Sequence, residues 1–212
     1  WSYSMPWYTH SSPVYSRKNK IVVCGSEEGV VYGFNALTGD VQWKFQVGGA
    51  VKASFALNQD ERYVAFGSYD TYVYVLDIKN GNLVQRWETG NIIQSGAIFH
   101  GEFLYIGCGD KTIYCFNYKN GECMWSYRTG GRIFATPIIA QGNLYIGSND
   151  GIFYEFNLIN GAVTGMFQSI ERIVNQAVFD QETNYFYLPT VANELYKLRY
   201  ENPFIRTGDG NI

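Results

Sequence analysis

Histidine is the residue type that most readily moves protons near neutral pH, and this sequence has two. His100, in the segment FHGEF, falls in an expected hairpin turn and is interpreted as a solvated turn residue. His10, in the segment YTHSSP, is the only catalytic candidate, an acid or base with Lys52 or an arginine as an electrostatic clamp. The sequence shows no Ser–His–acid set that would form a catalytic triad.

Four acidic residues recur at nearly constant spacing and could be taken for a ring of metal ligands: Glu28, Asp70, Asp110 and Asp150. Each is expected in a hairpin turn, where an Asp side chain accepts hydrogen bonds from nearby backbone N–H groups. Four turns spread around one molecule lie too far apart to share an ion. The pattern therefore favours a structural role and predicts no metal site.

The chain has four cysteines, with no C-x-x-C pair that would indicate a zinc site or a redox motif: Cys24, Cys108, Cys115 and Cys123. Three of them fall in small or apolar columns of the repeat described below, whereas Cys115 belongs to a mixed column. Four unpaired thiols favour the cytoplasm. A periplasmic or secreted location stays open, because the sequence begins at Trp1 and an export signal could precede it.

The composition argues against two classes of function. The net charge is −3 and no basic run is present, so a nucleic-acid partner is not expected. No apolar stretch approaches the roughly 20 residues that span a bilayer. With 46% hydrophobic residues, 23 Gly and only 5 Pro, the chain is expected to form many short strands joined by glycine turns.

The elements that must position these residues repeat five times along the chain. One column is spaced by 42, 40, 40 and 42 residues: Gly25, Gly67, Gly107, Gly147 and Pro189. A second column lies seven residues later: Tyr32, Tyr74, Tyr114, Tyr154 and Tyr196. Internal repetition with a period near 40 residues is typical of propellers and solenoids.

Each repeat is interpreted as four strands, which in the third repeat are residues 95–99, 103–107, 112–116 and 123–127. The third strand is apolar at nearly every position, as in VVYGF and YVYVL, so both of its faces must be covered. Four-stranded units that stack on copies of themselves describe the blades of a β-propeller. The predicted fold is therefore all-β, a five-bladed β-propeller of four-stranded antiparallel blades.

Ring closure depends on the outer strands, because only four occur within complete repeats. Residues 1–3 (WSY) align with the outer strand WKF one period later, so this N-terminal strand is predicted to close the last blade. Residues 204–206 (FIR) are the rival outer strand, and five blades of a larger ring are a further alternative. The expected boundaries are a monomeric propeller over residues 1–203 and a tail over residues 204–212.

The repeat resembles the quinoprotein-type repeat of the pyrroloquinoline-quinone (PQQ) dehydrogenases and of their non-catalytic relatives. The segments GSNDGIFYEFNLING and GSEEGVVYGFNALTGDVQW carry the resemblance. It implies a propeller, with eight blades in the known enzymes and in the lipoprotein relatives. The enzymes also bind PQQ and calcium, using an adjacent cysteine pair and an Asp base. This chain has no such pair and no acidic residue in its inner-strand columns, so PQQ and other cofactors are not expected.

The loops that enter the inner strands vary between repeats, whereas the framework recurs. Variation on a rigid scaffold is typical of a binding surface. The candidate ligand-binding residues form an aromatic and basic rim: Trp7, Tyr8, His10, Lys52, Gln94, Arg132, Arg172 and Asn175. An anionic group or an acidic peptide could dock there. The structural alternative is that these are exposed loop residues and water-filled channel linings.

Three functional hypotheses follow from the sequence. The favoured one is a non-enzymatic binding or scaffold domain that recognises a protein, a peptide or a small anionic ligand on the loop face around the central channel. The second is an enzyme with an active site at the channel mouth that uses His10. The third is a sensor domain of a larger protein.

Overall fold

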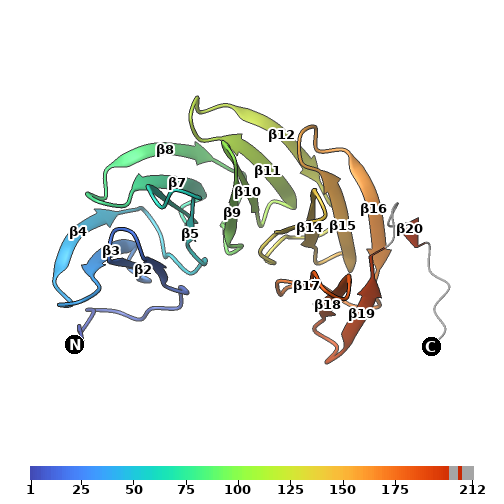
Figure 1. Ribbon diagram of the computed structural model, residues 1–212, viewed down its shortest axis with the longest axis horizontal. Coiled ribbons are helices and arrows are strands. Elements are labelled where there is room, and N and C mark those ends of the chain that lie inside the picture. Colours follow the sequence, from blue (N-terminus) through green and yellow to red (C-terminus); the bar gives the residue numbers. More distant parts are fainter. Residues whose placement is uncertain (201–204, 207–212) are drawn as a thin grey trace.

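The computed structural model describes residues 1–200 and the backbone of residues 205–206, and it contains five antiparallel β-sheets arranged side by side along an open arc (Figure 1). We number these sheets blades 1 to 5 in chain order. Blade 1 contains β1 (Val14–Ser16), β2 (Ile21–Gly25), β3 (Val30–Asn35) and β4 (Val41–Gln46). Blade 2 contains β5 (Ala56–Leu57), β6 (Tyr63–Gly67), β7 (Tyr72–Asp77) and β8 (Leu83–Glu88).

The other three blades continue the same order from the inner to the outer side of the arc. Blade 3 contains β9 (Ala97–His100), β10 (Phe103–Gly107), β11 (Thr112–Asn117) and β12 (Cys123–Arg128). Blade 4 contains β13 (Ile138–Ala140), β14 (Asn143–Gly147), β15 (Ile152–Asn157) and β16 (Val163–Gln168). Blade 5 contains β17 (Val178–Asp180), β18 (Tyr185–Pro189) and β19 (Leu195–Arg199). The all-β propeller class and the four-stranded blade are thereby confirmed for blades 1 to 4.

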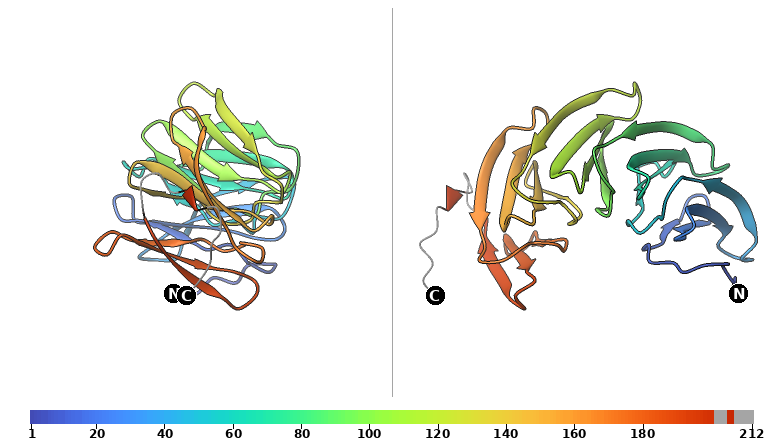
Figure 2. Two further views of the ribbon diagram at one scale, coloured as in Figure 1. Left: turned by 90° about the vertical axis from the view of Figure 1, so that its right-hand side faces the viewer. Right: turned by 180° about the vertical axis from the view of Figure 1, so that it is seen from behind.

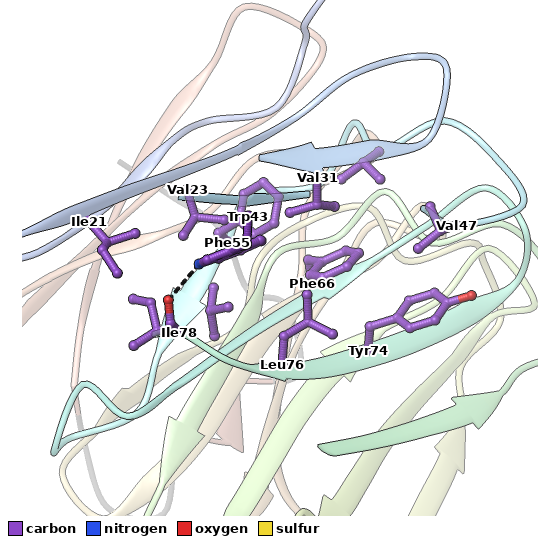
Figure 3. Packing of buried hydrophobic residues seen from close by; sticks show 12 residues of the cluster. Ile21, Val23, Val31, Trp43, Val47, Phe55, Phe66, Tyr74, Leu76 and Ile78 are labelled. Carbon is purple, nitrogen blue, oxygen red and sulfur yellow. Dashed lines mark hydrogen bonds between the residues drawn. The ribbon is translucent and has the colours of Figure 1, made fainter. Parts of the chain in front are cut away.

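The hydrophobic core lies between neighbouring blades, as the apolar third strands predict. Between blades 1 and 2, Val23 and Val31 from one sheet pack with Phe66 and Leu76 from the next (Figure 3). Each of blades 2 to 4 therefore has a forward face, which contacts the following blade, and a rear face, which contacts the preceding one. This arrangement is what near-continuous burial of strands β3, β7, β11 and β15 requires.

A tryptophan on the outer strand links one blade to the next. The indole Nε1 of Trp43 donates a hydrogen bond of 2.8 Å to the carbonyl of Ile78 in blade 2 (Figure 3). The ring lies over Gly81, where a Cβ would stand 2.6 Å from the indole. Trp125 repeats this contact two junctions later, between blades 3 and 4, on the carbonyl of Leu158 and on Gly161.

Three of the four recurring acidic residues have the structural role that their turn position predicts. Asp110 Oδ1 accepts a hydrogen bond of 2.8 Å from the backbone N–H of Thr112, within its own turn. Its Oδ2 accepts from the Tyr114 hydroxyl at 2.6 Å and from the N–H of Gly90 in the preceding blade at 2.9 Å. Asp70 and Asp150 make the same three kinds of bond, so the column joins neighbouring blades.

Replacement of Asp110 by Asn is expected to lower the free energy of unfolding by about 1–3 kcal/mol at neutral pH, because the amide nitrogen cannot accept from Tyr114 and Gly90. Burial of Asp110 opposes ionisation, but the hydrogen bonds from Tyr114, Gly90 and Thr112 outweigh it and lower the pKa of the carboxyl. A lowered folded-state pKa makes this stabilisation complete above the unfolded value of about 3.9. It is lost as the pH falls through the folded-state pKa.

Urea titrations of the wild type and Asp110→Asn at pH 7 and in acid measure this difference. The gap between the two proteins should shrink in acid. Asp40→Asn is the matched control, because Asp40 is exposed and accepts only within its own turn, from Thr38. An Asp110→Asn protein as stable as the Asp40→Asn control at pH 7 would contradict the assigned role.

The predicted closure of the ring by the N-terminal strand is wrong for this structure. The N-terminal segment and blade 5 lie at opposite ends of the open arc in both face-on views (Figures 1 and 2). Residues 1–3 are not in a strand, and among the described residues no fourth strand pairs with β19. The sequence pattern correctly assigned the N-terminal residues to the outer-strand column but placed them beside the wrong blade. The pattern reflects the blade on which an outer strand packs and does not show with which strand it pairs.

The N-terminal segment (residues 1–12) instead occupies the place of an outer strand and its following loop on the rear face of blade 1. Trp1 Nε1 donates to the carbonyl of Ala36 at 2.9 Å and its ring lies over Gly39, as Trp43 does on blade 2. Tyr3 contacts Phe34 edge to face at 4.9 Å between ring centroids. The Tyr8 carbonyl accepts from the backbone N–H of Glu27.

The rival outer strand also lies elsewhere. The backbone of β20 (Ile205–Arg206) pairs in parallel with β16 of blade 4 and not with β19. The expected boundary between propeller and tail, at residues 203 and 204, lies outside the described residues.

All four cysteines are free, and two of the three expected to be small buried side chains, Cys24 and Cys108, are buried. Burial raises the pKa of Cys24 to about 11 and that of Cys115 to about 12. The packing interpretation fails for Cys123, which is exposed at the start of β12. Cys115, whose mixed column left its environment open, is fully packed between blades 3 and 4.

Candidate functional site

A groove of about 530 Å³ lies on the inner side of the arc, where the loops enter the inner strands. Four loops supply its walls: residues 47–55, 89–96, 129–137 and 169–177, which join each outer strand to the next inner strand. The groove therefore spans four blade junctions. Its lining residues are Lys52, Ser54, Gln94, Phe134, Thr136, Val174, Asn175 and Gln176.

A buried β-branched residue fixes each of these loops immediately before its variable position. Ile93, Ile133 and Ile173 are fully buried and press against the glycines Gly67, Gly107 and Gly147. Their backbone N–H groups donate to carbonyls of the adjacent hairpin. Since the anchor is constant, the next residue projects at an equivalent place in each blade: Lys52, Gln94, Phe134 and Val174.

At one end of the groove, the ammonium group of Lys52 lies 2.5 Å from Glu27 Oε1, and His10 Nδ1 lies 2.6 Å from the same oxygen. The hydrogen bond from Lys52 lowers the pKa of Glu27, with a smaller contribution from His10 against a desolvation that raises it. The same bond raises the pKa of Lys52. Glu27 therefore neutralises Lys52, the one cation among the described residues that line the groove.

Two further contacts lead from Lys52 toward the middle of the groove. The Lys52 ammonium lies 5.5 Å from the centroid of the Tyr69 ring, and the Tyr69 hydroxyl is 3.3 Å from Gln94 Oε1. With the Gln94 oxygen facing Tyr69, its amide N–H₂ group is free to donate to a ligand. The hydroxyl oxygen of Thr136 accepts from the backbone N–H of Gly96, which likewise leaves its O–H to donate.

The rest of the lining is uncharged. Ser54, Thr136, Asn175 and Gln176 offer hydroxyl and amide groups, and Phe134 and Val174 offer apolar surface. This combination suits a ligand that accepts hydrogen bonds and buries an apolar group, such as an extended stretch of polypeptide. An anionic ligand fits less well, because Lys52 is already paired with Glu27.

The structure brings together three of the eight residues proposed from the sequence: Lys52, Gln94 and Asn175. The other five do not line the groove. Trp7 and Tyr8 are exposed and pack edge to face on each other, Arg132 and Arg172 are exposed on the loops, and His10 faces Glu27. The groove residues Ser54, Thr136 and Gln176 lie two positions after the variable site of their loops and were not among the proposed residues.

The described residues contain no group of three or more His, Cys, Asp or Glu side chains arranged to hold a metal ion. No helix capable of crossing a membrane was found in the part of the chain that the structure describes. His10, the one catalytic candidate, has a side chain that is 61% exposed and is separate from the groove lining.

Comparison with known proteins places the repeat in a family. The model of the PQQ_2 family, described as outer membrane protein assembly factor BamB, matches residues 1–92 and 69–172. A curated relative, the beta-alanine-activating enzyme of Danio rerio, is 35% identical over 108 residues, which cover 49% of this chain and 9% of that protein.

Solved structures show the same fold at low sequence identity. BamB from Moraxella catarrhalis superposes with a TM-score of 0.79 at 16% identity, covering 93% of this chain and 63% of BamB. A chain of the mitotic checkpoint complex gives a TM-score of 0.78 at 13% identity, covering 89% of this chain and 60% of that one. The chain thus spans less than two thirds of the length of either structure, and about a tenth of the curated relative.

Proposed function

Because the chain belongs to the PQQ_2 family of the outer membrane protein assembly factor BamB, we propose that it is a non-enzymatic binding scaffold that holds a segment of a partner protein in its inner groove. The observation that carries the proposal is the lining of this groove, where blades with the same framework present different side chains. A rigid framework with variable loops is the usual basis of a recognition surface.

The chemistry of the groove supports a polypeptide ligand over a small anion. Its hydrogen-bonding groups are hydroxyls and amides, and its cation is neutralised by Glu27. Backbone carbonyls of an extended segment can accept from Gln94, Asn175 and Gln176, while one apolar side chain packs on Phe134. The match to the beta-alanine-activating enzyme of Danio rerio covers 9% of that protein, so the activity in its name is not proposed for this chain.

A photo-cross-linking amino acid at position 94 tests the proposal. We expect it to capture a partner protein in cells, whereas the same amino acid at position 37 does not, because Leu37 is an exposed turn residue away from the groove. The captured partner is then identified, purified and titrated against the purified chain. The triple variant Phe134→Ala, Asn175→Ala, Gln176→Ala should weaken its binding at least about tenfold, or about 1.4 kcal/mol.

A second triple variant separates the groove from the aromatic and basic rim. Trp7→Ala, Arg132→Ala, Arg172→Ala removes exposed residues that do not line the groove and should leave the affinity within about twofold. The proposal fails if the rim variant abolishes binding while the groove variant does not. Circular dichroism and urea midpoints confirm that both variants are folded.

A further inference from the structure

The turn between the third and outer strands of blades 2, 3 and 4 contains an asparagine followed by glycine: Asn80–Gly81, Asn120–Gly121 and Asn160–Gly161. All three asparagines are exposed. Asparagine is thermally labile, and most so before glycine, because a residue without a Cβ lets its backbone nitrogen approach the preceding side chain. Blade 1 has Thr38 at this position and therefore lacks the reactive amide.

The reaction open to these pairs is an intramolecular cyclisation followed by hydrolysis. The backbone nitrogen of the glycine gives up its proton and attacks the side-chain Cγ of the asparagine. The N–Cγ bond forms and the Cγ–Nδ2 bond breaks, and the amide nitrogen leaves with a proton as ammonia. Water then opens the succinimide ring at either of its carbonyl carbons and gives aspartate or isoaspartate. The only co-reactant is water, and no electrons are exchanged with another molecule.

The folded turn keeps the two reacting groups apart. The glycine N–H donates to the carbonyl four residues earlier, at 2.8 Å for Gly81, 2.9 Å for Gly121 and 3.0 Å for Gly161. The asparagine Oδ1 accepts from the N–H two residues later, at 2.9, 3.0 and 3.0 Å in the same order. The reaction therefore requires the turn to open, and its rate depends on the free energy of that local opening.

Indole rings cover the glycine in two of the three turns. Trp43 lies over Gly81 and Trp125 lies over Gly161, and both glycines are buried. Each indole also donates a hydrogen bond to the carbonyl next to the one that holds the glycine N–H: Ile78 and Leu158. Opening either turn exposes an indole ring to water and breaks its hydrogen bond, which raises the free energy of opening.

The turn of blade 3 lacks this cover. Gln85 stands where blade 1 has Trp43, and its side-chain amide is the group closest to a Cβ built on Gly121, at 3.1 Å. Gly121 is accordingly only partly buried. Trp87 donates to the Gly121 carbonyl at 2.7 Å, but its ring stacks on Phe116 and does not cover the glycine. Since a glutamine amide bonds readily to water, this turn opens at a lower cost than the other two.

We propose that Asn120 is a site of spontaneous covalent modification, the Asn-Gly turn that this fold protects least against conversion into aspartate and isoaspartate. Asn120 Nδ2 donates to Glu122 Oε2 at 2.7 Å, an exposed hydrogen bond that contributes less than a buried indole. The reaction replaces this donor with a carboxylate that repels Glu122. Isoaspartate also lengthens the backbone of a turn that Gln85 and Trp87 contact, so modification weakens the junction between blades 2 and 3.

Peptide mapping by mass spectrometry measures the loss of all three side-chain amides in one sample. The chain is incubated at mildly alkaline pH, once folded and once unfolded in guanidinium chloride. The unfolded rate divided by the folded rate gives the protection of each turn and removes the effect of neighbouring residues. We expect the protection of Asn120 to be at least about tenfold smaller than that of Asn80 and of Asn160. Equal protection at the three sites, or greater protection at Asn120, overturns the proposal.

Trp125→Gln gives the turn of blade 4 the cover that the turn of blade 3 has, and it tests the cause. The protection of Asn160 should fall about tenfold, to the range of Asn120, because opening no longer exposes an indole. Asn80 is the internal control, since its cover Trp43 is unchanged and its protection should stay the same. No change at Asn160, or an equal fall at Asn80, contradicts the protective role of the indole.

Discussion

Trp43→Ala should lower the free energy of unfolding by about 3–5 kcal/mol, the largest loss expected from any single outer-strand change. Trp43 is only 7% exposed. Its ring contacts Gly33 on the neighbouring strand of its own blade and Gly81 in a turn of the next blade. Its removal leaves a cavity at the junction of blades 1 and 2, where the neighbouring core residues cannot collapse without moving two sheets. It also leaves the carbonyl of Ile78 without the indole donor.

Trp43→Phe separates these two contributions. Phe retains most of the ring contact with Gly33 and Gly81 but cannot donate to Ile78, so we expect it to lose clearly less than Trp43→Ala, with about 1 kcal/mol from the hydrogen bond. Trp7→Ala is the control, because Trp7 is 54% exposed and should change stability by less than about 0.5 kcal/mol. Urea unfolding followed by far-UV circular dichroism measures all three. Equal losses for Trp43→Ala and Trp7→Ala would contradict the assigned junction role.

Most of the fold was predictable from the sequence because each blade repeats the same local chemistry. The period places Gly107 at the end of β10 and Tyr114 within β11, and the turn chemistry places Asp110 between them. In blades 2 to 4, each of these residues and its counterparts contact the same kinds of atoms. Repetition therefore supplies information that one copy of the pattern would lack.

Whether the blades close into a ring was not predictable from the sequence, because closure depends on the curvature of the arc and not on the repeat pattern. WSY at residues 1–3 has the outer-strand sequence, and Trp1 makes the outer-strand contact, but it makes it on blade 1 rather than beside β19. An outer strand packs on the following blade as much as it pairs within its own. The outer-strand column of the repeat reflects both the packing and the pairing, so the sequence alone cannot show which of the two a given segment makes.

The candidate site was predictable only in part for a similar reason. The variable column that contains Lys52 and Gln94 does line the groove, but the column that contains Arg132 and Arg172 does not. Both columns vary between blades, so variation alone does not separate them. In each groove loop, the buried anchor before the variable position, such as the residue that precedes Phe134, sets the direction in which the next side chain projects. That direction appears only when the loop is folded.

Gly107→Val should lower the free energy of unfolding by about 3 kcal/mol, at the upper end of the usual cost of overpacking. The φ angle of Gly107 is not positive, so the requirement is one of space rather than backbone conformation. A Cβ at this position would lie 2.2 Å from Cγ2 of Ile133 and 3.2 Å from Cδ1 of Ile146, and both side chains are buried. The two methyl groups of Val extend the clash, and the anchor Ile133 has no open space into which it can move.

The cause can be isolated by removing the obstructing side chain. Ile133→Ala alone should cost about 2–5 kcal/mol, because it leaves a cavity. In the double variant Gly107→Val, Ile133→Ala, the new methyl groups fill part of that cavity, so the loss should be smaller than the sum of the two single losses by at least about 1 kcal/mol. Additive losses would instead locate the cost of Gly107→Val in the β10 backbone. A relieved clash would explain why the repeat requires glycine here: the anchor of each groove loop occupies the space that a side chain would need.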